Sequence, residues 1–141
     1  MKGLFTFYYT SPMKWTVKKV ERALGGKLIG NPVMRRFICE TILLLPSEII
    51  EYVCARVWFI SSPEDSWALT FKGSEIKDRS LILISDELLN QNERQIKHTV
   101  LHEIGHVLLN HRNSIGYQQT PIEISRQERE ADLFADKYLP L

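Results

Sequence analysis

The stretch NERQIKHTVLHEIGHVLLNH, residues 92–111, has a helical pattern around which the rest of the chain can be arranged. Asn92 stands at the position of an N-cap, and Gln95 follows three residues later, as in a capping box. Apolar residues recur every three or four positions, the period of one helix face: Ile96, Val100, Leu101, Ile104, Val107 and Leu108. Asn110 to Gly116 should end the helix. The pattern predicts a helix whose apolar face is buried in a core.

Within this stretch, His102, Glu103 and His106 form the pattern HExxH. Residues four positions apart lie one turn apart on the same helix face, so both imidazoles can reach a single zinc ion at about 2.0–2.1 Å. Glu103 projects beside the pair, where it can take a proton from a metal-bound water without binding the metal. The alternative is a pair of surface histidines with a solvent-facing glutamate. The apolar flanks favour a catalytic metal site with one Zn²⁺ per chain.

Two histidines do not complete a catalytic zinc site, so a third ligand must come from elsewhere in the chain. The longer pattern HExxHxxGxxH is not met, because Leu109 replaces its glycine and Arg112 its third histidine. A later helical segment places Glu128 and Asp132 four residues apart on one face. In this arrangement Glu128 is the third zinc ligand, and Asp132 holds a ligand imidazole from behind. Glu130 points to another side of that helix.

The sequence HEIGHVLLNH, from residue 102, followed by EREADLFADKYLP, from residue 128, resembles the ImmA/IrrE-type metallopeptidases. These proteins share a gluzincin-like HExxH helix and a later ExxxD/N helix that ends in Leu-Pro. The resemblance extends from about Leu81 to Pro140, follows the family order of elements from Pro46 onward, and does not cover residues 1–36. It implies zinc-dependent hydrolysis of an intracellular protein, typically a helix-turn-helix transcriptional repressor cleaved at a limited site.

Three segments before this helix have the composition of β-strands. They are residues 57–60, 67–72 and 81–84. Their short connections, which contain Pro63 and Gly73, favour an antiparallel meander. A helix after Pro46 precedes the strands, and the last helix is expected to begin at Ser125. The predicted fold class is α+β, with a small antiparallel sheet of about three strands packed on the HExxH helix, and a C-terminal helix that supplies the third zinc ligand.

Charge is distributed unevenly along the chain. Residues 1–36 carry eight Lys or Arg and one acid, a charge of +7, whereas residues 37–141 carry ten basic and sixteen acidic residues, a charge of −6. A helix through Met13–Leu24 and a loop over Lys27–Arg36 predict a basic N-terminal arm, 1–36, ahead of a zinc metallopeptidase domain, 37–141. A solvated helix face explains these cations, and the alternatives are docking on the acidic body of the same chain or contact with nucleic acid or an acidic partner. No direct contact with nucleic acid is expected.

The sequence also bears on the compartment of the protein. No uninterrupted apolar run exceeds four residues, against the roughly 18 that cross a bilayer, so no membrane association is expected. The N-terminus lacks the apolar region and cleavage site of a signal peptide. Cys39 and Cys54 are isolated from each other, which is typical of buried free thiols in a reducing compartment. A cytoplasmic protein is therefore predicted.

Four further residues lie close enough in sequence to bear on the site. His98 precedes the motif by one helical turn, but it lies about 12 Å along the axis from the second histidine, too far to share one ion. His111 follows the motif near the helix end, where a cation suits the helix dipole. Tyr117 or Tyr138 could donate a hydrogen bond to the developing oxyanion, and the alternative for each is a packing role.

The sequence therefore predicts a zinc-dependent endopeptidase, with Glu103 as its general base. The alternative is a non-catalytic, zinc-containing module, regulatory or of toxin–antitoxin type, that binds a repressor or an antitoxin. A protein that binds nucleic acid through its basic N-terminal arm is a third reading. Glu103 favours the enzyme, because a purely structural zinc site has no use for a base beside an open metal position.

Overall fold

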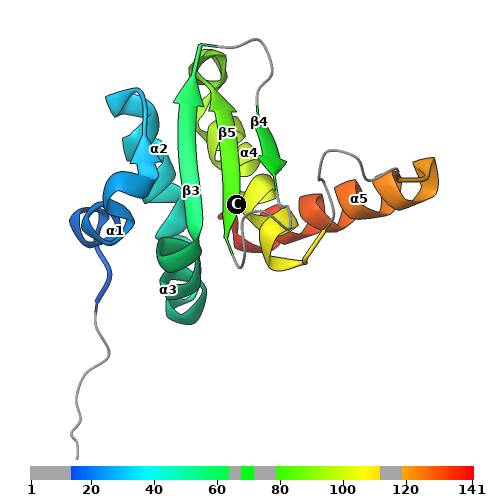
Figure 1. Ribbon diagram of the computed structural model, residues 1–141, viewed down its shortest axis with the longest axis horizontal. Helices are drawn as coiled ribbons and strands as arrows, with labels where there is room; N and C mark the ends of the chain where they lie inside the picture. Colours follow the sequence, from blue (N-terminus) through cyan, green and yellow to red (C-terminus); the bar gives the residue numbers. More distant parts are fainter. Residues whose placement is uncertain (1–13, 64–67, 72–78, 112–118) are drawn as a thin grey trace, which may run out of the picture.

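The computed structural model describes residues 14–63, 68–71, 79–111 and 119–141, which form an α+β fold as predicted (Figure 1). The elements, in chain order, are helix α1 (Val17–Leu24), 3₁₀ turn η1 (Gly25–Lys27), strand β2 (Leu28–Ile29), helices α2 (Pro32–Ile42) and α3 (Ser47–Arg56), strands β3 (Val57–Ser62), β4 (Ala68–Phe71) and β5 (Ser80–Ser85), 3₁₀ turn η2 (Asp86–Asn90), and helices α4 (Glu93–Leu108) and α5 (Pro121–Tyr138).

The four strands form one mixed sheet in the order β2-β3-β5-β4. β3 runs parallel to β2 and to β5, with Phe59 opposite Leu28 on one side and opposite Ile82 on the other. Only β4 is antiparallel, and it pairs with β5 through positions such as Leu69 and Leu83. The predicted antiparallel meander is therefore wrong, although its three strands exist.

The reason for the difference lies in β5. Its sequence, Ser80–Ser85, is apolar at four consecutive positions. Such a strand is disfavoured at the edge of a sheet and favoured between two hydrogen-bonded neighbours. β5 therefore lies between β3 and β4, which are consecutive in sequence but not paired. The sequence pattern identified the strands but could not fix their order.

One face of the sheet packs against the helices. Phe59 and Ile82 are fully buried on that face, and Trp58 and Leu81 on the opposite face are only half-buried. In Figure 1, α1, α2 and α3 lie on the β2–β3 side, α4 lies behind β5, and α5 extends away beyond α4. Helix α4 contacts α2, β4, β5 and α5, so the HExxH helix occupies the centre of the fold as its apolar pattern predicts.

Helix α2 was not predicted, because Gly30, Asn31 and Pro32 read as a loop. In the structure Asn31 is the N-cap of α2, and its Oδ1 accepts hydrogen bonds from the backbone N–H groups of Val33 at 2.8 Å and Met34 at 3.4 Å. Pro32 is the first residue of the helix, where its missing N–H costs nothing. The same residues that interrupt a strand or a helix interior can begin a helix.

The N-terminal segment takes part in the common core. Val20 and Leu24 of α1 and Met34 of α2 are fully buried, and they cluster with residues of α3, α4 and the sheet. The proposed boundary between residues 36 and 37 falls inside α2. The division into an arm and a domain stays a prediction, and this packing weighs against it.

Helix α5 begins earlier than Ser125. Thr120 is its N-cap, with a complete capping box in which Thr120 and Glu123 bond each other's backbone N–H groups at 3.1 Å each. Pro121 occupies the first helical position. The capping box and this proline explain why the helix begins before Ser125.

Two further expectations can be compared with the described residues. None of the described helices is long and apolar enough to cross a membrane. Cys39 and Cys54 are free and buried, as predicted. Burial raises the pKa of the Cys39 thiol to about 12 and that of the Cys54 thiol to about 11, so both stay protonated at neutral pH.

Candidate metal centre

The site is built where α4 and α5 pack closely together. A Cβ atom at Gly105 of α4 would lie only 3.1 Å from side-chain atoms of Phe134 on α5. On the α5 side, Ala131 and Ala135 are fully buried and small. Small residues on both helices therefore let the longer side chains between them converge.

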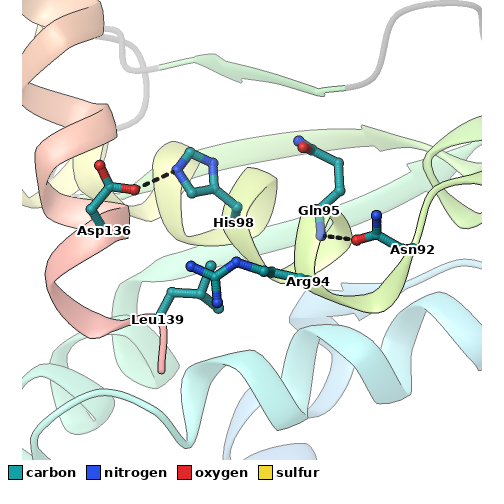
Figure 2. Close-up of a pocket in the computed structure, with 6 residues that line it drawn as sticks. All are labelled: Asn92, Arg94, Gln95, His98, Asp136 and Leu139. Carbon is teal, nitrogen blue, oxygen red and sulfur yellow. Dashed lines mark hydrogen bonds and ion pairs between the residues drawn. The ribbon is translucent and has the colours of Figure 1, made fainter. Parts of the chain in front are cut away.

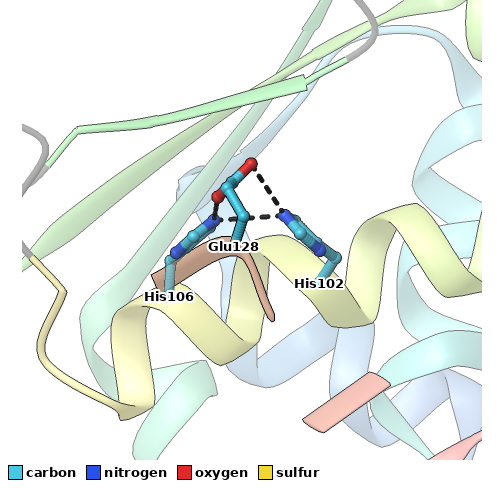
Figure 3. A group of neighbouring side chains, drawn as sticks. All are labelled: His102, His106 and Glu128. Atoms are coloured by element: carbon cyan, nitrogen blue, oxygen red, sulfur yellow. Dashed lines mark hydrogen bonds and ion pairs between the residues drawn. The ribbon is translucent and has the colours of Figure 1, made fainter. Parts of the chain in front are cut away.

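Three side chains from the two helices point toward one another: His102, His106 and Glu128 (Figure 3). They could together hold a metal ion, and we call them the metal group. The Nε2 atoms of His102 and His106 are 3.1 Å apart. Glu128 spans the pair, with one carboxylate oxygen 2.7 Å from His106 Nε2 and the other 3.6 Å from His102 Nε2. The two His side chains are only 14% and 11% exposed, whereas Glu128 is 53% exposed, so the group opens to solvent on the carboxylate side.

The donor atoms fit a small tetrahedral cation. Ligands at about 2.0–2.1 Å from zinc, at tetrahedral angles, lie about 3.3 Å from one another. The observed separations of 3.1, 2.7 and 3.6 Å lie on both sides of that value. Two imidazoles and one carboxylate are also the ligand set of catalytic zinc sites that keep a fourth position for water.

Asp132 lies behind His102, on the side of the ring away from Glu128. Its Oδ1 is 2.8 Å from His102 Nδ1, the ring nitrogen that faces away from Glu128. A carboxylate can only accept, so Nδ1 donates and the Nε2 atom of a neutral ring keeps its lone pair toward Glu128. Lone pairs that face one another in this way are compatible with a cation between them.

The surroundings of His106 also alter its pKa. Burial lowers the pKa of His106 below its usual value, while the neighbouring carboxylate of Glu128 acts in the opposite direction. A neutral imidazole is the form that binds a metal, so this shift reduces competition from protons.

Glu103 is buried, with 7% of its surface exposed, directly beside the metal group. One of its carboxylate oxygens lies 4.0 Å from His102 Nε2. Glu103 is therefore close enough to contact the donor atoms through one bridging water molecule, although it is not one of the three residues of the metal group. This is the position that a general base at a metal-bound water needs.

Sequence reasoning missed the environment of His111, which we expected at the solvated end of the helix. His111 is 6% exposed, and its Nδ1 is 2.9 Å from His106 Nδ1. Its Nε2 is 2.7 Å from an oxygen of Glu130. Glu130 is thus not among the three donor residues, and it contacts His111, which in turn contacts His106.

The residue that could have indicated the buried position of His111 is Asn110, directly before it. It has a φ of 60°, the left-handed conformation that ends many helices, and asparagine tolerates it well. The reversal allows the His111 N–H to donate to the His106 carbonyl at 3.0 Å and turns the His111 ring back toward α4. An asparagine directly before a histidine at a helix end is the pattern that could have indicated this.

The tyrosines proposed to contact the oxyanion receive no support from the described contacts. Tyr138 packs edge-on against Phe134, with ring centroids 5.0 Å apart, and Lys137 lies over its ring. Tyr117 lies outside the described residues. Both assignments stay predictions.

His98 pairs with Asp136 instead of with the metal group. Its Nε2 is 3.1 Å from Asp136 Oδ1, at the edge of a pocket of about 300 Å³ that Arg94, Gln95 and Leu139 also line (Figure 2). The expectation that His98 does not share the ion is consistent with this contact.

A comparison with known protein families finds a match that covers helices α4 and α5. Residues 94–139, about a third of the chain, match the family model Peptidase U49. The matched segment runs from the first turn of α4 to the end of α5 and so contains every residue of the metal group. It indicates a peptidase, a hydrolase of peptide bonds, but not specifically the ImmA/IrrE family that the motifs resemble. Comparison with curated proteins finds no match, and neither does comparison with solved structures.

Proposed function

We propose that this protein is a zinc-dependent endopeptidase, with zinc held by His102, His106 and Glu128 and with Glu103 as general base. The observation that carries the proposal is the convergence of three metal-binding side chains from two helices, with a buried carboxylate beside them. The peptidase family match over the same helices gives independent support for hydrolysis of peptide bonds.

Zinc bound at this site would lower the pKa of its water toward about 7 and polarise the scissile carbonyl. Glu103 would accept the water proton on its carboxylate and return it to the leaving amine. Asp132 keeps the His102 ring oriented through the 2.8 Å hydrogen bond. The 53% exposure of Glu128 leaves the carboxylate side of the group open for a substrate.

The substrate would lie along β4. This strand is an edge of the sheet, its only described partner is β5, and it contacts α4. Figure 3 shows it passing over the metal group, flanked at both ends by undescribed segments. An extended peptide that adds to this edge would pass close to the zinc. The other edge, β2, pairs with β3 on the α1–α3 side of the sheet.

The natural substrate that the ImmA/IrrE resemblance implies is an intracellular helix-turn-helix repressor. The competing proposal is a non-catalytic zinc module that binds such a protein. The place of Glu103 beside the donor atoms favours catalysis, since a module that only binds needs no base next to its metal. A role for the basic N-terminal residues in binding nucleic acid receives less support, because α1 is packed into the core.

The deciding experiment is Glu103→Gln, which keeps the shape of the side chain and removes the base. Zinc-loaded wild type and variant would be incubated with a proteome-derived peptide mixture, and new N-termini would be counted by mass spectrometry. We expect zinc content and fold to be retained and cleavage to fall by about 10²–10⁴-fold. Glu93→Gln is the matched control, because Glu93 lies on the same helix but pairs with Lys97 at the surface. Equal cleavage by wild type and Glu103→Gln would refute the proposal.

A further inference from the structure

Behind the metal group, four side chains form one continuous line of contacts. It runs from Glu130 through His111 to His106, over 2.7 and 2.9 Å, and then to Glu128 over 2.7 Å. His111, in the middle, is buried and contacts Nδ1 of His106, whereas Glu128 contacts Nε2 on the other side of that ring. His111 is therefore not a fourth ligand, since its contact uses the ring nitrogen that faces away from the metal group.

When a metal occupies Nε2 of His106, the carboxylate of Glu130 fixes the direction of the two remaining hydrogen bonds. A carboxylate only accepts, so the Nε2–H of His111 donates to Glu130. The Nδ1 atom of a neutral His111 then has a lone pair, which accepts the Nδ1–H of His106. His106 is left with its lone pair on Nε2, the atom that faces Glu128 and His102.

The opposite direction would place the His106 proton on Nε2. That proton would donate to Glu128 and occupy the space in which the metal binds. By accepting from Nδ1 of His106, His111 therefore favours the tautomer in which a neutral His106 offers Nε2 as a ligand atom. Glu130 supports this tautomer, because it accepts a hydrogen bond from the one ring N–H of a neutral His111.

The two ligand histidines are thus held in different ways. Asp132 contacts His102 directly at 2.8 Å, whereas His106, near the end of α4, is reached through an intervening histidine that the turn at Asn110 brings back. Each of the two histidines is therefore connected to a carboxylate through its Nδ1 atom, His102 directly to Asp132 and His106 through His111 to Glu130. Such carboxylates generally orient metal-binding histidines.

We infer that His111 and Glu130 form a positioning pair that fixes the His106 ring and directs its Nε2 lone pair at the metal. This inference deepens the proposed function and rests on it. Neither residue belongs to the three that could hold the metal. The pair would raise zinc affinity and would leave the reaction itself to Glu103.

A double-mutant cycle on zinc affinity tests the pair, with zinc binding measured by competition with a chromophoric chelator. His111→Ala should weaken zinc binding by about 10–100-fold, the usual effect of losing a partner behind a ligand. Glu130→Ala should weaken it less, because His111 would remain. The double variant should bind like His111→Ala alone, since Glu130 acts only through His111.

Two controls separate positioning from a general loss of structure. Asp136→Ala removes another histidine–carboxylate contact between α4 and α5 and should leave zinc affinity within about twofold, because Asp136 contacts no ligand in the described residues. His111→Gln offers an amide oxygen to His106 and an amide N–H to Glu130, so it should recover part of the affinity. Far-UV circular dichroism of each variant checks the fold.

The outcomes distinguish this inference from the proposed function. If wild type binds zinc and His111→Ala binds it equally well, or if the effects of His111→Ala and Glu130→Ala simply add, the positioning pair is wrong and the zinc site stands. A wild-type protein that binds no zinc would refute the zinc site, and this inference with it.

Discussion

Histidines of α4 contact carboxylates of α5 at two places along the interface between these helices. At one end His98 contacts Asp136. At the other end two histidines, His102 and His106, contact Glu128, and His102 also contacts Asp132. The residue types and the two helices are the same. The difference lies in burial and convergence: the His98 and Asp136 side chains are 26% and 63% exposed, whereas those of His102 and His106 are 14% and 11% exposed and share one carboxylate. A single histidine beside a carboxylate is thus an ordinary surface contact. A second imidazole and a close approach of the two helices reduce the exposure of such a contact to water and bring three donor atoms together.

Loss of the shared carboxylate should have the largest effect. Glu128→Ala removes a ligand, so zinc affinity should fall by more than the roughly 10–100-fold expected for Asp132→Ala, which only frees the His102 ring. Competition with a chromophoric chelator measures both. If Asp132→Ala were the more damaging of the two, the wrong carboxylate would have been assigned to the metal.

The comparison also shows how far the sequence could lead. HExxH spacing placed His102 and His106 on one face of α4, and ExxxD spacing placed Glu128 and Asp132 on one face of α5, because helical geometry is local. The contacts of His111 with His106 and Glu130 depend on a single left-handed residue at Asn110 and on how the two helices pack. No periodicity within one helix contains that information.

Strand order was out of reach for the same reason. The apolar pattern identified β3, β4 and β5, but whether β5 lies outside or between its neighbours depends on contacts across the sheet. β2, with two residues, is too short for any alternation to be visible. Helix α2 was missed because Asn31-Pro32 is compatible with both a turn and a helix start, and only the N-cap hydrogen bonds distinguish them.

A second prediction separates the scaffold from the site. Leu24 on α1 is fully buried in the common core, so Leu24→Ala should lower the free energy of unfolding by about 2–5 kcal/mol. Zinc affinity of the folded protein should be unchanged, because Leu24 contacts no metal-binding residue in the described part of the chain. Leu133→Ala, at a position 62% exposed, is the control and should cost less than about 0.5 kcal/mol.

Urea unfolding of the metal-free variants measures this difference. Equal stability of Leu24→Ala and wild type would show that α1 is a dispensable arm after all, as the charge distribution alone predicts.

A smaller effect is expected where the two helices touch. Gly105→Val places carbon atoms against Phe134, already 3.1 Å from the position of a Cβ, and should cost about 1–3 kcal/mol of stability. It should also weaken zinc binding, because α5 must move away and take Glu128 with it. Gly26→Val, where a Cβ meets nothing within 4 Å, is the control. Unaltered stability and zinc affinity for Gly105→Val would mean that close helix approach does not create the site.

The most direct test of the zinc centre is the metal content of the purified protein. Elemental analysis by mass spectrometry should find about one zinc per chain in the wild type. The same analysis should find none in the double variant His102→Ala/His106→Ala, because a lone carboxylate, Glu128, would remain of the three ligands. Wild-type protein that takes up no zinc, or a double variant that retains one zinc per chain, would contradict the account.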